Sequence, residues 1–224
     1  MEKEKVVMAL SGGMDSSTLL VWLLTQGYEV EAVSFDYGSK HNQYERQMAE
    51  KFAKRYGVKL HHVDLTGVMA GFSSSLLKTG GPIPEGHYTD ENMKATVVPG
   101  RNIIFLSILS GLAWSVGAKQ IAIGIHSGDH AIYPDCRKAF YLAMRNAILE
   151  GTDGAVNVIA PFIDWDKTMI LQFGIPAGVP YRLTRTCYKE QPLSCGVCGS
   201  CVERLESFHN LGIRDPILYE TDPE

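Results

Sequence analysis

The chain has 224 residues, enough for one domain or at most two, built around a hydrophobic core that needs no disulfide support. Hydrophobic residues make up 45% of the chain and charged residues 21%, which excludes a disordered, collagen-like or coiled-coil protein. The net charge of -4 provides no general attraction to nucleic acid or anionic lipid.

The apolar stretches are interrupted by Ser and Gly and are shorter than the roughly 20 residues that cross a bilayer. Residues 1–5 include acidic side chains, unlike the basic, apolar and small-residue order of a secretory signal. We therefore expect a cytoplasmic protein with no membrane segment and no nucleic-acid partner.

Short apolar runs alternate along the chain with longer amphipathic stretches, the rhythm of βαβ units. The first helix places a group of leucines on one face and is closed by Gly27. The sequence thus predicts an α/β fold with an open, mostly parallel sheet and helices on both faces. Strands are predicted at 6–10, 30–35, 58–63, 120–124 and 156–160, and helices at 15–25, 42–56, 101–116 and 136–149.

Two stretches interrupt this rhythm, 65–98 and the tail from residue 172. Both are rich in Gly, Pro and polar residues, and both are far longer than the usual connection of about 4–6 residues. Neither has the composition of a linker between independent domains. We therefore assign residues 1–175 to one domain and residues 176–224 to a small C-terminal appendage packed on the same domain.

A glycine-rich segment, Ser-Gly-Gly-Met-Asp-Ser-Ser at 11–17, lies between the first strand and the first helix. The glycines allow a tight turn with outward N–H groups, and the helix dipole favours a bound anion. A serine-capped turn is the plain structural alternative. The full pattern favours phosphate binding, although it is neither a Walker loop nor a Gly-x-Gly-x-x-Gly dinucleotide loop.

Four of the five cysteines, Cys187, Cys195, Cys198 and Cys201, lie close together near the C-terminus, and Cys136 stands apart. Four thiolates suit a tetrahedral Zn²⁺ at about 2.3 Å from each sulfur. Because sulfur then fills every position, no site remains for an activated water, so we predict one structural zinc per chain. An iron–sulfur cluster and a redox pair of cysteines are the alternatives.

A third segment, 125–137, begins at the end of a predicted parallel strand, where open α/β sheets collect ligands. It contains polar and aromatic residues that include Asp135 and Tyr133. Read structurally, Asp135 is a helix cap and Cys136 a small buried hydrophobe. Lys167 lies in the first turn of a predicted helix, an unfavourable place for a cation unless an anion is near.

The 11–17 loop resembles the PP-loop of the N-type ATP pyrophosphatases, which activate a substrate oxygen by transferring AMP to it. It occurs together with Phe-Asp-Tyr-Gly at 35–38, Val-Pro-Gly-Arg-Asn at 98–102, Tyr-Pro-Asp-Cys-Arg at 133–137 and the four-cysteine tail. Over residues 6–215 this set resembles the 7-cyano-7-deazaguanine synthases of queuosine biosynthesis. Ala131-Ile132 and Met169 depart from the family pattern and bear on the fine substrate contacts.

The resemblance implies an ATP-dependent carbon–nitrogen ligase that converts 7-carboxy-7-deazaguanine and ammonia to 7-cyano-7-deazaguanine through an adenylated carboxylate and an adenylated amide. It implies ATP with Mg²⁺ as co-substrate, contacted by Leu10, Ser11, Gly12, Gly13, Met14, Asp15, Ser16, Ser17, Ser34 and Phe35. The candidate catalytic residues are Asp15, Arg101 and Lys167. The candidates for holding the deazaguanine are Arg101, Asp129, Tyr133, Asp135 and Arg137.

Three other functions compete with this interpretation. A homologue could stop at the amide, and a PP-loop enzyme could modify tRNA, although the net charge of -4 does not favour the basic face that tRNA needs. A zinc-ribbon interaction module would use the same four cysteines but leaves the loop at 11–17 unexplained. The sequence leaves open whether the chain forms a homodimer.

Overall fold

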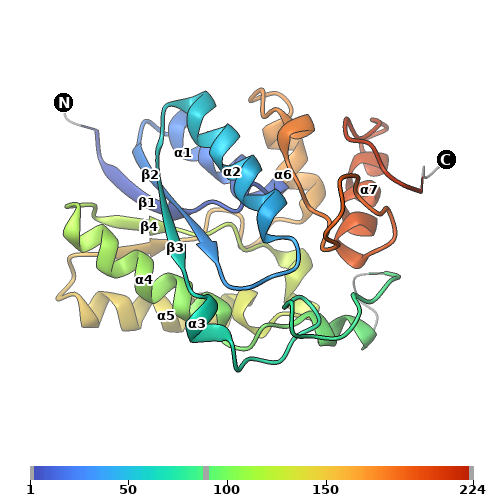
Figure 1. Ribbon diagram of the computed structural model, residues 1–224. Helices are drawn as coiled ribbons and strands as arrows, with labels where there is room; N and C mark the ends of the chain where they lie inside the picture. The colour runs from blue at the N-terminus through green and yellow to red at the C-terminus, as the bar shows by residue number, and fades with distance from the viewer. Residues whose placement is uncertain (1–2, 88–90, 222–224) are drawn as a thin grey trace.

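Five parallel strands form one sheet at the centre of the computed structural model, which describes residues 3–87 and 91–221 (Figure 1). The strand order is β3-β2-β1-β4-β5, so the chain reverses its direction of travel across the sheet between β1 and β4. Open parallel sheets bind ligands at such a reversal. The strands are β1 (Lys5–Ala9), β2 (Glu29–Asp36), β3 (Lys59–Asp64), β4 (Gln120–Ala122) and β5 (Asn157–Ile159).

Helices cover both faces of the sheet, with α1, α2 and α6 on one side and α4 and α5 on the other (Figure 1). The α-helices are α1 (Met14–Thr25), α2 (Asn42–Tyr56), α3 (Thr66–Met69), α4 (Arg101–Ser115), α5 (Lys138–Gly151), α6 (Lys167–Gly174) and α7 (Gly199–Asn210). Short 3₁₀ turns are η1 (Glu91–Thr96), η2 (Ser127–Ala131), η3 (Pro134–Cys136) and η4 (Tyr181–Leu183).

The protein has two hydrophobic cores, one on each face of the sheet, and alternate side chains of the central strand β1 pack into one or the other. Val6 and Met8 pack into the core under α1 and α2, and Val7 packs into the core under α4. All three side chains are fully buried. A strand covered on both faces is expected to be apolar at every position, which explains why β1 reads as a continuous apolar run.

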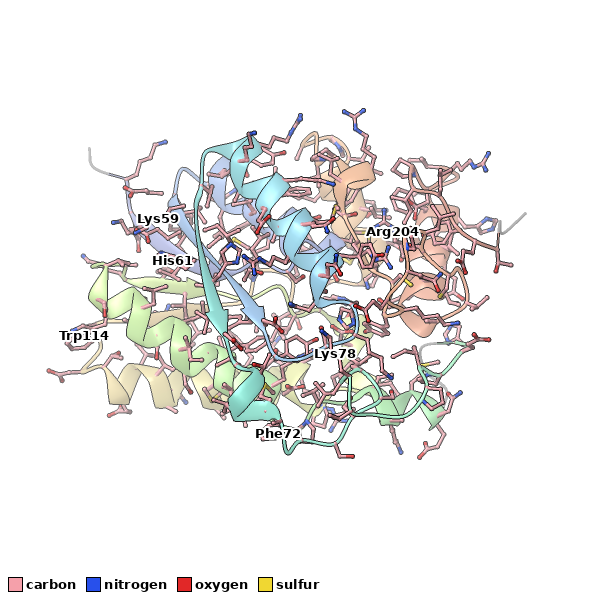
Figure 2. The ribbon with its side chains drawn as sticks, in the orientation of Figure 1. Lys59, His61, Phe72, Lys78, Trp114 and Arg204 are labelled. Atoms are coloured by element: carbon pink, nitrogen blue, oxygen red, sulfur yellow. The ribbon has the colours of Figure 1, made fainter. Side chains whose placement is uncertain are left out.

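The edge strand β3 has no fully buried residue. Lys59 and His61 on β3 instead surround Glu31 of β2, with the Lys59 ammonium 3.2 Å and His61 Nε2 2.7 Å from the Glu31 carboxylate (Figure 2). Lys5 of β1 lies 3.6 Å from the same carboxylate. These side chains therefore form a compact ionic cluster across β1, β2 and the edge strand β3.

The predicted fold class is confirmed. Every predicted strand and helix is observed, with its ends displaced by no more than two residues. The predicted irregular tail from residue 172 is wrong in part, because it contains the end of α6 and all of α7. The buried face of α7 consists largely of Gly, Ser, Cys and Arg rather than large apolar residues. The sequence therefore lacks the helical periodicity of apolar residues that would predict this helix.

Among the described residues, Glu91–Ser115 is the one stretch long and apolar enough to cross a membrane, and 28% of its most apolar window is buried. In the fold this stretch is two elements, η1 and α4, separated by a turn at Gly100, whose φ is +66°. The 15 residues of α4 fall short of the roughly 20 that a membrane span requires. One face of α4 packs on the sheet beside β1 and β4.

The turn between β1 and α1 presses against α2. Gly12 in this turn has a φ of +80°, and a Cβ placed on it would lie 2.6 Å from the Ala49 amide nitrogen and 2.7 Å from the Glu45 carbonyl oxygen. Backbone atoms cannot move aside as a flexible side chain can. Only glycine therefore fits at this position, and the absence of its side chain sets the distance between the turn and α2.

Substitution of Gly12 by Ala should therefore lower the free energy of unfolding by about 3–5 kcal/mol, because it adds steric overlap to backbone strain. Gly27→Ala is the matched control: its φ is +87°, but nothing lies within 4 Å of the added methyl group. The control should cost only the backbone strain, about 1–2 kcal/mol. Thermal and urea denaturation measure both; equal losses would show that contact with α2 does not constrain the turn.

Candidate active site

A pocket of about 200 Å³ opens at the carboxyl end of the sheet, next to the paired strands β1 and β4. The turn after β1, residues 123–125 after β4 and the first turn of α4 line it. Arg185, Thr186 and Tyr188 from the C-terminal segment also line it. The pocket therefore lies at the reversal in strand order where the topology places a ligand.

The turn between β1 and α1 carries the predicted phosphate-binding loop. Ser11 Oγ lies 3.1 Å from Ser16 Oγ and accepts a hydrogen bond from the Gly13 amide at 3.1 Å. Gly13 is the N-cap of α1 and provides no side-chain cap. The first turn of α1 lines the pocket, so its positive dipole end faces a space that an anion can enter.

Lys167, the first residue of α6, is 5% exposed and has carboxylates from two other helices beside its ammonium group. Lys167 Nζ lies 3.5 Å from Asp15 Oδ2 and 2.5 Å from Glu203 Oε2. The fully buried His126 places its Nε2 3.6 Å from Asp15 Oδ2 and 3.5 Å from Asp129 Oδ2. Three carboxylates and two basic side chains thus meet from four parts of the chain.

The close pairing shifts the pKa values of these groups. Burial alone would raise the pKa of Asp15, but Lys167 and His126 lower it well below its usual value. Burial alone would lower the pKa of Lys167, but Asp15 and Glu203 raise it above its usual range. Asp15 and Lys167 therefore form a charged pair at neutral pH.

Two effects shift the pKa of His126 in opposite directions. Burial would lower its pKa, but Asp129 and Asp15 raise it to about 9. The Gly128 amide, however, donates to His126 Nδ1 at 3.2 Å, a bond that the doubly protonated ring must give up. In either state the Nε2–H group faces the two carboxylates.

Several buried polar atoms around the loop have no hydrogen-bond partner within the described part of the chain. They are Asp15 Oδ1, Ser17 Oγ, His126 Nε2 and Arg185 Nε. Buried polar groups are nearly always hydrogen-bonded to protein, water or a ligand. A carboxylate oxygen suits a hard cation such as Mg²⁺, and the N–H and O–H groups suit phosphate oxygens. Of these atoms, Asp15 Oδ1 and Arg185 Nε belong to residues that line the pocket, and their chemistry fits a phosphate-bearing ligand with a divalent cation.

Arg101, the first residue of α4, lies over two aromatic rings. Its guanidinium carbon is 5.7 Å from the centre of the Tyr37 ring and 6.0 Å from that of Tyr133. Burial by itself would lower the pKa of Arg101, but Tyr37 and Asp135 raise it, so the guanidinium remains charged. A fixed cation bordered by aromatic faces suits a planar, anionic heterocycle.

Asp135 and Cys136 have structural contacts with Asn102 of α4. The Asp135 carboxylate accepts a hydrogen bond from the Asn102 amide at 3.0 Å and so caps α4, and Asn102 Nδ2 lies 3.5 Å from Cys136 Sγ. Burial, together with Asp129 and Asp135, raises the pKa of the Cys136 thiol well above its usual value. A thiol held protonated in this way is a poor nucleophile.

The start of α2 forms an uncharged corner of the pocket. The His41 ring is tilted against that of Tyr188 with centroids 5.4 Å apart, and His41 Nε2 lies 3.6 Å from the Glu45 carboxyl group. Burial lowers the pKa of His41 to about 3. Burial also raises the pKa of Glu45 to about 8, although Arg101 and Arg185 oppose the shift. At neutral pH this corner therefore holds a neutral imidazole and a carboxylic acid.

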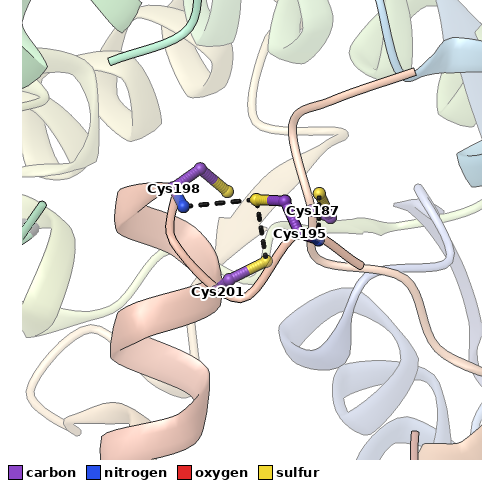
Figure 3. Close-up of side chains that lie close together, drawn as sticks. All are labelled: Cys187, Cys195, Cys198 and Cys201. Atoms are coloured by element: carbon purple, nitrogen blue, oxygen red, sulfur yellow. Dashed lines mark hydrogen bonds between the residues drawn. The ribbon is translucent and has the colours of Figure 1, made fainter. Parts of the chain in front are cut away.

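The four C-terminal cysteines form a second cluster, with every sulfur within 4.8 Å of the others (Figure 3). The sulfurs of Cys195 and Cys201 are 4.0 Å apart, close to the roughly 3.8 Å expected between two thiolates of a tetrahedral zinc. The amides of Cys195 and Cys198 donate to the sulfurs of Cys187 and Cys195, each at 3.3 Å. All four cysteines are buried, so the donor set fits a closed, structural metal site.

A buried arginine also fixes α7. Arg204, fully buried, donates to both oxygens of Asp215 at 2.6 and 2.9 Å and to the Thr184 hydroxyl at 2.6 Å. A larger hollow of about 830 Å³ lies beyond this helix, lined by residues between 205 and 219. It contains none of the predicted site residues, so the smaller pocket at the strand ends is the candidate active site.

The family model described as queuosine biosynthesis protein QueC matches residues 5–212. The chain belongs to the QueC family. It is 45% identical over 218 residues to the 7-cyano-7-deazaguanine synthase of Caldicellulosiruptor saccharolyticus, covering 97% of this chain and 96% of the relative. It is 47% identical over 226 residues to the enzyme of that name from Porphyromonas gingivalis strain ATCC 33277, covering 98% and 100%.

Among solved structures, NMN synthetase from Francisella tularensis has a TM-score of 0.50 and 12% sequence identity, covering 95% of this chain and 79% of that one. At this identity the similarity shows a shared fold. The QueC-family assignment rests on the sequence relatives, and the fold agrees with it.

The pocket of this QueC-family chain collects most of the residues that the sequence proposed. Ser11, Gly13, Met14, Asp15, Ser16, Arg101, Asp129, Tyr133 and Lys167 line it. Leu10, Gly12, Ser17, Ser34, Phe35, Asp135 and Arg137 do not. Phe35 is buried and stacks on Phe105, a lining residue, with ring centroids 4.1 Å apart. Arg137 is exposed at the start of α5.

Sequence reasoning missed lining residues that lie outside the motifs. The pocket wall includes His41, Glu45 and Arg185, none of which is among the predicted site residues. Glu203 was also missed, although it touches Lys167. The one sequence signal for Glu203 is its position two residues after Cys201, which places it in the metal-binding segment.

The partly buried carboxyl group of Glu45, whose side chain is 20% exposed, predicts a pH-dependent loss of stability. Because the folded-state pKa is raised from 4.5 to about 8, the contribution of Glu45 is fully present below pH 4.5 and is lost as the pH rises through 8. Glu45→Gln mimics the protonated form. Relative to the parent, the variant should gain about 2–4 kcal/mol of stability between pH 4.5 and 8. Urea denaturation across this range measures the difference; a difference independent of pH would contradict the assignment.

Proposed function

We propose that the protein converts 7-carboxy-7-deazaguanine, ATP and ammonia into 7-cyano-7-deazaguanine. One observation carries this proposal: in a chain of the QueC family, the anion-binding turn with Asp15 and Lys167 opens into the same pocket as Arg101 and its two tyrosine rings. Phosphates and a planar anionic substrate can therefore meet in one space.

The chemistry explains why ATP is needed. A carboxylate resists attack by ammonia because it is anionic and because oxide is a poor leaving group. Transfer of AMP to the carboxylate removes both obstacles, and ammonia then displaces AMP to give the amide. Transfer of AMP from a second ATP to the amide oxygen, followed by loss of AMP and a proton, leaves the nitrile.

The chain contributes positioning and electrostatic stabilisation to these steps. The N-terminus of α1 and Lys167 would hold the phosphate groups, and the unpartnered Asp15 oxygen would hold Mg²⁺. Magnesium, when bound, supplies positive charge to the departing pyrophosphate. Asp15 and Arg101 line the same pocket, so AMP transfer would take place in the space that they share.

Arg101 would bind the substrate carboxylate and, with Tyr37 and Tyr133, enclose the planar ring. Asp129, which lines the pocket, would accept from the N–H groups of the heterocycle. Asp135 and Arg137 would assist from outside the lining, Asp135 through its contact with Asn102 at the start of α4. No covalent intermediate on the protein is required, consistent with the protonated state favoured for Cys136.

The four cysteines would hold one structural zinc ion per chain. The ion would secure the segment that contains α7, whose first residue follows Cys198 directly. We assign residues 1–175 to the ATP-dependent domain and residues 176–224 to this segment packed on it. The protein would act in the cytoplasm on small molecules, without a nucleic-acid or membrane partner, and a homodimer is compatible with this function.

The direct test is incubation with 7-carboxy-7-deazaguanine, ATP, Mg²⁺ and ammonia, followed by mass spectrometry. The expected products are the nitrile with AMP and pyrophosphate. An amide as the final product would favour an amide-forming homologue, and ADP would contradict adenylation.

Asp15→Asn should reduce kcat/KM by roughly 100-fold or more, because it removes charge next to Lys167 and the proposed magnesium ion.

Cys136→Ser serves as the control in this assay. The proposed chemistry uses no thiol, so the variant should retain measurable turnover. Ser11→Ala, in contrast, should lose activity as Asp15→Asn does. A loss in Cys136→Ser equal to that in Asp15→Asn would contradict the absence of a covalent step.

Removal of one metal ligand should separate the two kinds of cysteine. Cys198→Ser should abolish stoichiometric zinc and lower the free energy of unfolding by about 3 kcal/mol or more, because metal binding contributes directly to folding. Cys136→Ser should keep one zinc ion per chain. Elemental analysis and thermal denaturation measure both variants; iron in place of zinc would favour a cluster instead.

A further inference from the structure

Glu203 reaches the candidate active site from the metal-binding segment. Its carboxylate lies 2.5 Å from Lys167 Nζ, and its side chain is 13% exposed. A Cβ placed on Gly128 would lie 2.5 Å from Glu203 Oε1, so the absence of a side chain at Gly128 makes room for the carboxylate. Glu203 is therefore an inserted, closely packed side chain and not a surface acid.

The charges around Lys167 oppose the entry of a phosphate chain. Asp15, Asp129 and Glu203 supply three carboxylates, and Lys167 and His126 supply the basic groups. Asp15, Asp129 and Lys167 line the pocket, and Glu203, which does not line it, contacts the ammonium group of Lys167. Of the three acids, Glu203 has the shortest contact with Lys167.

A lysine ammonium is a compact charge on a flexible stem and can exchange partners. A phosphate oxygen that approaches Lys167 competes with Glu203 for the positive charge of the ammonium group. The carboxylate then remains nearby and repels the phosphate. The contact with Glu203 thus opposes phosphate binding and assists phosphate release.

We propose that Glu203 is a positioning residue that occupies, in the nucleotide-free protein, the place on Lys167 that a phosphate oxygen takes when ATP or pyrophosphate binds. This inference rests on the proposed function for the identity of the anion. Glu203 thereby limits how tightly the site holds ATP and how long it holds pyrophosphate.

A purely structural clamp between α6 and α7 predicts the opposite result. If Glu203 only held Lys167 in place, removal of its charge would disorder the lysine and weaken the binding of phosphate. The sign of the change in affinity therefore separates the two roles.

The test is Glu203→Gln, which keeps the shape and removes the charge. Titration calorimetry with inorganic pyrophosphate and Mg²⁺ should show affinity raised roughly three- to tenfold. The KM for ATP should fall by a similar factor while kcat does not rise. Zinc content, measured on the same preparation, should stay at the value of the parent protein, and the melting temperature should lie above the temperature of the titration, so that the variant is folded when binding is measured.

Glu206→Gln is the matched control, because Glu206 lies one turn further along α7, is about half exposed and does not contact Lys167. It removes the same charge and should leave pyrophosphate affinity unchanged. Unchanged or weaker binding in Glu203→Gln, or equal tightening in Glu206→Gln, would overturn the proposal.

If Glu203→Gln does not fold, Glu203→Asp provides the same test. Its carboxylate is one methylene shorter and withdraws from Lys167, so pyrophosphate affinity should rise by a smaller factor; a decrease would overturn the proposal. Calorimetry needs no turnover, so failure of the proposed synthase reaction and failure of this inference are separate outcomes. Binding of pyrophosphate without nitrile formation would contradict only the reaction.

Discussion

The buried ammonium group of Lys167 is the constraint on which the site depends. A cation enclosed to this degree needs negative charge at contact distance, and Asp15 and Glu203 provide it from opposite ends of the chain. To bring them together, the turn after β1, the start of α6 and the whole of α7 must gather at the carboxyl end of the sheet. The C-terminal segment is therefore part of the electrostatics of the pocket.

The pocket combines two environments with different demands. Around Asp15 and Lys167 the side chains are charged and paired, which suits a ligand whose own charge changes during the reaction. Around His41 and Glu45 burial favours the neutral forms, and Arg101 provides a fixed positive charge beside aromatic rings. Under the proposed function, this division would separate the binding of phosphate from the binding of a flat organic substrate within one cavity.

The sequence predicts the parallel sheet well, because apolar period and turn residues are local signals. The loop at 11–17 and the cysteines are predictable for the same reason, since spacing alone defines their geometry. His41 and Glu203 could not be predicted, because their roles arise from packing between distant segments. Ser34 and Phe35 show the converse: a position at a strand end does not decide which side chains reach the cavity.

The ionic cluster at the edge of the sheet has a consequence for association between molecules. An outer strand exposes unpaired backbone groups that can recruit a strand from another chain. Here an incoming strand would have to displace water from Lys59 and His61 next to Glu31. Desolvating the Lys59 ammonium group opposes such recruitment, so growth of the sheet into aggregates through β3 is disfavoured.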